Sequence, residues 1–262
     1  VMNGNFTNNG QSFFTNRTDF PSTADRYNSG NTYYTSDDNT GRVEVSFTSG
    51  TRDQVVDCNN LTYFSRLVIN KGVDATYTLF LQATDSANFR LLGRANENAD
   101  GDHASPATNP VAFVLVRGTA KLDNNIIIPV LNSGTNYAIP SGARLWVDGG
   151  YVRKPAGEAI VPYGIIEVKE GKLRADITND ITLRQAGKLK VDGGSVHIRA
   201  FRTSVQGASA QGTFEQNGGE VVIDGGSINT SYAQFALTYQ GNVFIMTGGT
   251  LVIRGRATLG TS

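Results

Sequence analysis

The sequence predicts an all-β fold in which short strands stack into a solenoid, and three observations support it. A block with a glycine corner recurs along the 262 residues, at a spacing typical of coils that cannot bury an apolar face alone. Apolar and polar residues alternate on both sides of each corner. The chain has 30 glycines and no sustained amphipathic helical pattern. The corner glycines of the five clearest copies are Gly150, Gly171, Gly194, Gly219 and Gly249.

Each copy predicts two short strands joined by a sharp bend. In the copy at 187–200, Leu189 and Val191 alternate with polar residues before the corner, and Val196 and Ile198 do so after it. Glycine allows the bend because it has no Cβ. Stacked copies form three inward columns, in which Gln216 is the one polar member, so we expect a buried glutamine or a local register shift there. The columns are Val147, Val168, Val191, Gln216, Met246; Leu145, Ile166, Leu189, Phe214, Phe244; and Val152, Leu173, Val196, Val221, Leu251.

The repeat weakens toward the N-terminus. Gly118 fits the template, whereas Gly50, Gly72 and Gly93 only end apolar runs. We therefore predict about eight or nine coils over residues 42–262 and an irregular N-terminal cap over residues 1–41, which are rich in asparagine and aromatic residues. The sequence ends directly after a coil, so we expect the chain to be part of a longer polypeptide or a partner to cover its last coils.

Composition excludes some classes of function. Lys plus Arg and Asp plus Glu both number 23, so no net charge favours nucleic acid or an anionic membrane. No apolar run is long enough to cross a bilayer. Cys58 is the single cysteine, so no intrachain disulfide can form, and we expect it to be a small buried hydrophobic residue.

The repeated corner blocks resemble those of a known architecture. The blocks that end in Asp148–Gly150, Asp192–Gly194, Asn217–Gly219 and Thr247–Gly249 are similar to coils of right-handed parallel β-helices of the pectin-lyase-like type. Residues 61–72 resemble coils of large secreted surface proteins of Bacteroidota, which often use type 9 secretion. The resemblance implies a right-handed parallel β-helix and an extracellular or cell-surface location.

Pectin-lyase-like enzymes need clustered carboxylates that hold calcium or act as acid and base. Here Asp148 and Asp192 share an outward column with Lys169 between them, and Glu167 and Glu215 share another that Lys190 interrupts. Alternating charges on neighbouring strands are typical of a solvated face. Neither histidine has a nucleophile or metal partner in its column, so the sequence predicts no catalytic residues.

Residues 96–103 contain the best candidate for a metal site, and Ca²⁺ is the one cofactor that the sequence suggests. Asn96, Asn98, Asp100 and Asp102 alternate around Gly101, which resembles the opening of a calcium loop. The twelfth position is Ala107 instead of a bidentate glutamate. A surface insertion with an Asp-Gly turn is the alternative.

An outward column of basic residues is the candidate ligand site. Its predicted members are Arg153, Arg174 and His197, flanked by Tyr151, Lys172 and Arg199. Stacked at strand spacing, they could bind an extended acidic glycan, with Tyr151 as an aromatic platform. A solvated ladder of charges is the alternative interpretation.

Outward positions become apolar near the C-terminus. Val222, Ile245 and Val252 stand where earlier coils carry basic residues, so we predict an interface there. A loop formed by residues 229–241 could cover these positions instead.

Together these features predict a non-catalytic structural or adhesive solenoid module of an exported cell-surface protein, with polysaccharide as a candidate ligand. A β-helix polysaccharide lyase or hydrolase is the alternative. A phage or viral receptor-binding fibre is a third, but it usually needs trimer signals that this sequence lacks.

Overall fold

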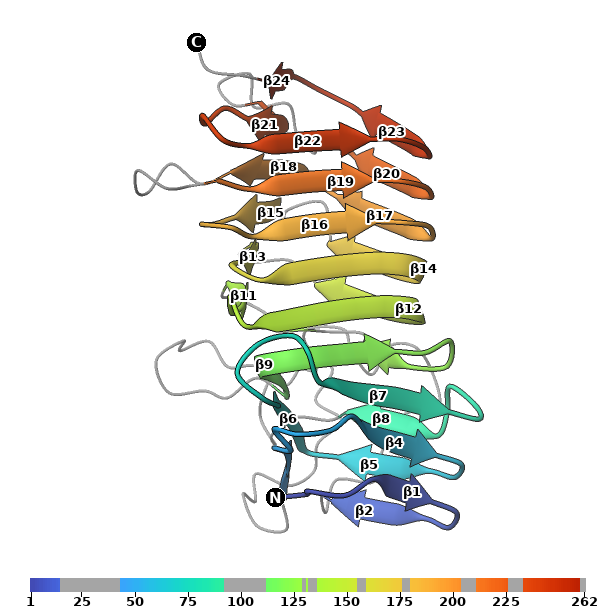
Figure 1. The fold of residues 1–262 in the computed structure, drawn as a ribbon. Coiled ribbons are helices and arrows are strands. Elements are labelled where there is room, and N and C mark those ends of the chain that lie inside the picture. The colour runs from blue at the N-terminus through green and yellow to red at the C-terminus, as the bar shows by residue number, and fades with distance from the viewer. Residues whose placement is uncertain are drawn as a thin grey trace.

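The computed structural model describes residues 1–14, 43–91, 112–128, 131, 136–154, 159–175, 180–203, 211–225 and 233–259. These residues form strands and turns without any helix, and the described part of the chain therefore has no helix able to cross a membrane. The strands stack into an elongated parallel β-helix with the termini near opposite ends (Figure 1).

All pairings between the described strands are parallel, and they form three sheets. The six-stranded sheet contains β11 (Tyr137–Ile139), β13 (Ile160–Pro162), β15 (Asp180–Leu183), β18 (Ala200–Thr203), β21 (Phe235–Leu237) and β24 (Ala257–Leu259). The three-stranded sheet contains β2 (Ser12–Phe14), β5 (Thr62–Phe64) and β8 (Phe89–Leu91). The 15-stranded sheet contains β1 (Phe6–Asn8), β3 (Glu44–Phe47), β4 (Gln54–Cys58), β6 (Arg66–Asn70), β7 (Thr78–Ala83), β9 (Phe113–Leu122), β10 (Ile127–Ile128), β12 (Ala143–Lys154), β14 (Ile165–Ala175), β16 (Lys188–Val191), β17 (Ser195–Ile198), β19 (Thr213–Gln216), β20 (Glu220–Ile223), β22 (Val243–Met246) and β23 (Thr250–Ile253).

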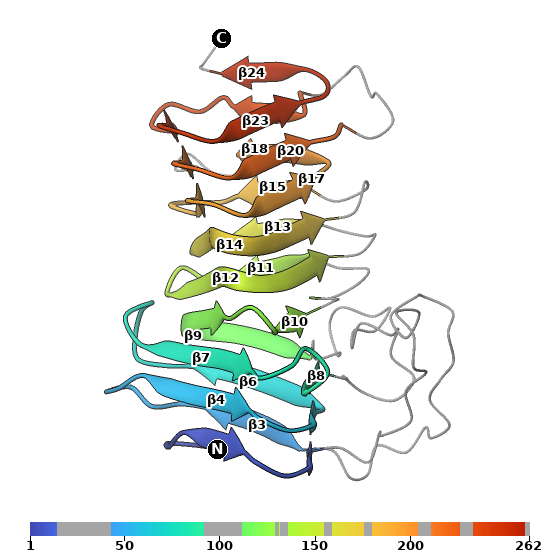
Figure 2. The ribbon, with the colours of Figure 1, turned by 90° about the vertical axis from the view of Figure 1, so that its right-hand side faces the viewer.

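From β12 onward each coil contributes to three faces. The first face holds the strands before the glycine corner, β16, β19 and β22, together with the first halves of β12 and β14. The second face holds the strands after the corner, β17, β20 and β23, with the second halves of β12 and β14 (Figure 2). The third face is the six-stranded sheet. The predicted pair of strands is present around Gly194, Gly219 and Gly249, whereas β12 and β14 each run continuously through the predicted corners at Gly150 and Gly171.

The apolar core follows the three predicted inward columns. Burial alternates residue by residue along β16 and β17, and along β12 on either side of its corner, as period-two patterning requires. Val191 and Leu189 are fully buried, and the Phe214 ring stacks on Phe244 of the next coil at 5.4 Å. Gln216 is a buried glutamine without a register shift. Its Nε2 donates to Thr250 O of the next coil at 3.0 Å.

Close stacking explains the corner glycines. Gly171, Gly194, Gly219 and Gly249 all have positive φ. A Cβ on Gly171 would lie 2.2 Å from the carbonyl oxygen of Gly150 in the coil below, which is far inside contact distance. Any side chain here would push neighbouring coils apart, so the corner is a stack of bare backbone.

The first residues of the chain join the stack of strands. Within the predicted irregular cap, β1 and β2 pair in parallel with β4 and β5, so residues 6–14 contribute strands to the stack. Residues 15–41 of that cap lie outside the described residues. Cys58 is fully buried, and burial raises the pKa of its thiol to about 11.

Lys71 is a buried charge that the sequence analysis did not single out. Its Nζ donates to Gln54 Oε1 at 2.6 Å and to Arg52 O at 3.0 Å. Burial lowers the pKa of Lys71 to about 8, because the charged amine loses hydration there.

Candidate functional site

The carboxylates of the first face are held in a ladder of ion pairs. Glu167 lies 3.1 Å from Arg144 Nη1 and 3.2 Å from Lys190 Nζ, and Lys190 also lies 2.5 Å from Asp192. Hydrogen bonding to Asp192 is the main reason why the pKa of Lys190 is raised. Glu167 thus links its coil to both neighbouring coils, which is a structural role, and Lys190 joins Glu167 to Asp192.

Two further contacts complete this ladder. Asp148 Oδ2 lies 2.7 Å from Lys121 Nζ, and Asp148 Oδ1 lies 3.5 Å from Lys169 Nζ. Lys121 also lies over the Trp146 ring, 4.5 Å from its centroid. A bulge pairs Asp148 with Glu170, so Lys169 reaches this carboxylate from a neighbouring position and not from directly opposite. Within the described ranges, no three His, Cys, Asp or Glu side chains come together as a metal site.

The second face carries a hollow of about 550 Å³ beside the glycine corners. Its floor contains Gly149, Gly150 and Gly171, which have no side chains to fill it. The requirement for glycine between stacked coils therefore also creates the hollow. Asn124 borders it at the corner, where a Cβ on Gly149 would overlap Asn124 Oδ1 at 1.7 Å.

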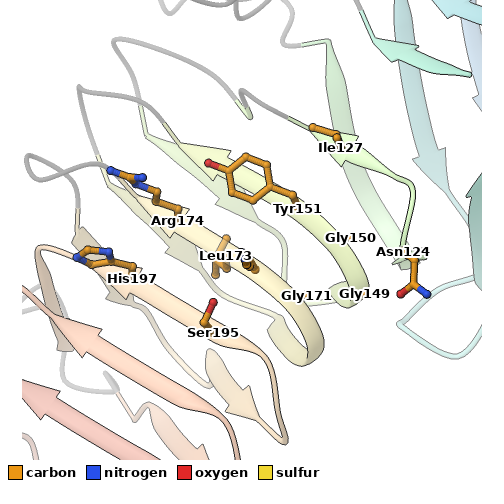
Figure 3. A pocket seen from close by; sticks show the side chains of 11 residues that line it. Asn124, Ile127, Gly149, Gly150, Tyr151, Gly171, Leu173, Arg174, Ser195 and His197 are labelled. Atoms are coloured by element: carbon orange, nitrogen blue, oxygen red, sulfur yellow. The ribbon is translucent and has the colours of Figure 1, made fainter. Parts of the chain in front are cut away.

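The side chains around the hollow come from successive coils. Tyr151 of β12 pairs in register with Lys172 of β14, which pairs with Ser195 of β17. Arg174 and His197 are likewise register partners on β14 and β17. Figure 3 shows Tyr151, Arg174 and His197 extending from three adjacent strands on the same side of the sheet. Lys172 and Arg174 are exposed.

The structure brings four of the six predicted ligand residues to this hollow: Tyr151, Lys172, Arg174 and His197. Arg153 is the register partner of Arg174 but does not line the hollow. Arg199 follows β17 and is directed elsewhere, since its Nε donates to Asp180 Oδ1 of the third face at 2.7 Å. That hydrogen bond is the main cause that raises the pKa of Arg199.

Sequence reasoning missed Ser195, Asn124 and Ile127. Ser195 stands in the same column as Tyr151 and Lys172, so the repeat alignment could have identified it. Ile127 belongs to β10, which pairs with Tyr151 and Val152 but lies in a segment without the corner template. Asn124 precedes β10 in a turn, where no periodic signal exists.

His197 and Asp224 mark the C-terminal side of the hollow. His197 Nε2 lies 3.3 Å from Asp224 Oδ2, and Arg254 Nη1 lies 2.8 Å from Asp224 Oδ1. Hydrogen bonds from Arg254 and then His197 lower the pKa of Asp224. Asp224 therefore stays ionised in this group, where the Arg254 guanidinium balances its charge.

The predicted calcium-site residues Asn96, Asn98, Asp100 and Asp102 lie outside the described residues. The predicted interface residues are placed on the last coils. Val222 and Val252 are half-buried register partners, and Ile245 of β22 is 39% exposed. Phe244 and Met246, which belong to inward columns, are 40% and 41% exposed because β22 is the last strand of its path. Residues 235–237, part of the alternative covering loop, instead form β21 of the third face.

Comparison of the chain with protein-family models, with curated proteins and with solved structures found no match.

Proposed function

We propose that this chain is a non-catalytic β-solenoid module of an exported cell-surface protein and that it binds acidic glycans at the hollow of the second face. The observation that carries this proposal is the lining of the hollow, which combines Tyr151, Lys172, Arg174 and His197 and, among the described residues, includes no Asp or Glu. Cations beside an aromatic ring suit a sugar polymer with acidic groups.

The shape of the molecule supports a role as a stalk or adhesive segment. Parallel coils form a regular rod (Figures 1 and 2). The glycine corners permit this stacking without gaps between coils. The resemblance of residues 61–72 to surface proteins of Bacteroidota favours an extracellular location and export, with the type 9 route as the candidate.

The alternative, a polysaccharide lyase or hydrolase, needs carboxylates that are available to act on substrate. On the first face Glu167 and Asp148 are paired with lysine or arginine of neighbouring coils, and Asp192 is paired with Lys190 of its own coil. This pairing supports the binding role over the enzymatic one. Release of unsaturated or reducing ends from polygalacturonate or alginate by the purified chain, abolished by one carboxylate substitution, would favour the enzyme.

A binding titration tests the proposal. The wild-type chain should bind an acidic polysaccharide at low salt, and binding should weaken as salt screens the exposed charges. The double variant Lys172→Ala, Arg174→Ala should lose roughly tenfold in affinity, because each exposed charge contributes up to about 1 kcal/mol. Arg117→Ala is the matched control, since Arg117 is exposed but does not line the hollow. Equal affinity of the double variant and the wild type would contradict the proposed site.

A further inference from the structure

We infer that the hollow selects a glycan in which an acidic sugar is flanked by neutral sugars, lying along the stack of coils. This inference rests on the proposed function and specifies its ligand. The evidence is the order of side chains along one outward column of the second face. From β10 to β20, register partners in that column are Ile127, Tyr151, Lys172, Ser195 and Glu220.

The N-terminal part of this column is apolar and aromatic. Ile127 and Tyr151 occupy adjacent coils and both line the hollow. An aromatic ring beside an aliphatic side chain offers a flat platform that suits the C–H face of a neutral sugar. The column therefore begins with a subsite that carries no charge.

The centre of the column is cationic. Lys172 is exposed, and Arg174 lies two residues along the same strand and on the same side of the sheet. Two cations at one level of the stack can both bind a single carboxylate or sulfate group. On the next coil Ser195 provides a hydroxyl that can donate to and accept from sugar hydroxyl groups.

The column then becomes acidic. Glu220 is the register partner of Ser195 and is exposed. Asp224 lies beyond His197 on the same coil as Glu220, where Arg254 pairs with it, so Glu220 supplies the negative charge of this part of the column. Adjacent strands lie ~4.8 Å apart, so Glu220 stands about 5 Å from the level of Ser195 and about 10 Å from Lys172. At low salt Glu220 would therefore repel an anion bound beside Ser195.

Strand spacing turns this order into selectivity. A glycan along the axis advances by close to one sugar per coil. With its central acidic group beside Lys172, a trisaccharide that is acidic at every sugar would place its next anion beside Ser195, one coil from Glu220, whereas a trisaccharide with neutral outer sugars would place no charge there. Repulsion of the wrong ligand is a common source of specificity.

The test compares two acidic trisaccharides by calorimetric titration at low salt. The hyaluronan trisaccharide has one acidic sugar between two neutral sugars, and trigalacturonate is acidic at every sugar. Wild type should bind hyaluronan several-fold more tightly. Glu220→Gln should tighten oligogalacturonate binding by about threefold, the size expected for one exposed charge, and should leave hyaluronan binding nearly unchanged.

Glu44→Gln is the control, because it removes an exposed carboxylate on β3, which lies near the N-terminal end of the stack and away from β12 and β14 (Figure 2). Equal or tighter binding of oligogalacturonate by wild type would overturn the inference while leaving the proposed function in place. An affinity ratio that Glu220→Gln does not change would also overturn it. Failure of wild type to bind either acidic ligand would contradict the proposed function and the inference together.

Discussion

Gly194→Ala should destabilise the solenoid, and the structure sets the size of the effect. Gly194 has a φ of 62°, which costs an L-residue roughly 1–2 kcal/mol. Its added Cβ would lie 2.4 Å from the carbonyl oxygen of Gly171 and 2.9 Å from the carbonyl carbon of Glu170. Both atoms are backbone of the coil below and cannot rotate away.

Relief of this overlap requires the two coils to separate locally. Overpacking of this kind typically costs roughly 1–3 kcal/mol. Together with the backbone term, the expected loss is about 2–5 kcal/mol in the free energy of unfolding. In a stack where each coil contacts only its neighbours, the damage should spread to adjacent coils.

Urea unfolding followed by far-UV circular dichroism measures this loss. Gly50→Ala is the matched control, because its added Cβ would meet nothing closer than 3.7 Å, an ordinary contact. That control should change the unfolding free energy by less than about 1 kcal/mol. A similar effect of both substitutions, or a loss at Gly194 below about 0.5 kcal/mol, would refute the argument that glycine is required by coil stacking.

Three further predictions concern the core, a buried amine and the open end. Val191→Asp should lower the free energy of unfolding by several kcal/mol, because it buries an unpaired charge. Lys190→Met should lower it by about 1 kcal/mol through lost ion pairs with Glu167 and Asp192. Equal shifts in the melting temperatures of the two variants would contradict the assignment of Val191 to an inward column. The pKa of Lys71 is about 8 in the folded chain and higher in the unfolded chain, so between these values the unfolded chain binds more protons. The free energy of unfolding of the wild type should therefore rise relative to that of Lys71→Met as pH increases from 8 toward 10. A difference between the two proteins that is constant with pH would contradict this. Phe244→Glu should reduce the binding of a hydrophobic dye and the self-association measured by light scattering, because Phe244 is 40% exposed at the end of the stack. A wild-type chain that is monomeric and binds no dye would argue against an interface there.

Much of the core could be predicted because its signal is local. Leu189, Val191 and Val196 are recognised as inward from their immediate neighbours in sequence, and all three are fully buried. The same local pattern identified Gln216 as an exception, and the structure places it in the core with its amide bonded to the next coil. The strands β1 and β2 could not be predicted in this way, because strands of three residues are too short to show alternation.

The candidate site also divides into residues that the sequence could place and residues that it could not. Tyr151, Lys172 and Arg174 could be aligned because each stands at a fixed offset from a corner glycine. Arg199 could not be placed in this way, because the chain turns toward the third face after Ile198 and the side chain meets Asp180, 19 residues earlier in sequence. Asn124 and Ile127 join the hollow from a segment without the template.

By itself, the sequence determined that the chain forms stacked parallel strands, which side chains point inward, and where the corners lie. These properties follow from period-two alternation and from glycine at tight bends, both of which act over a few residues. Only the tertiary structure decided which outward residues share a hollow, which charges neutralise one another and where the apolar column is left exposed. Those outcomes depend on register between coils of unequal length, and that register is decided by packing between residues far apart in the chain.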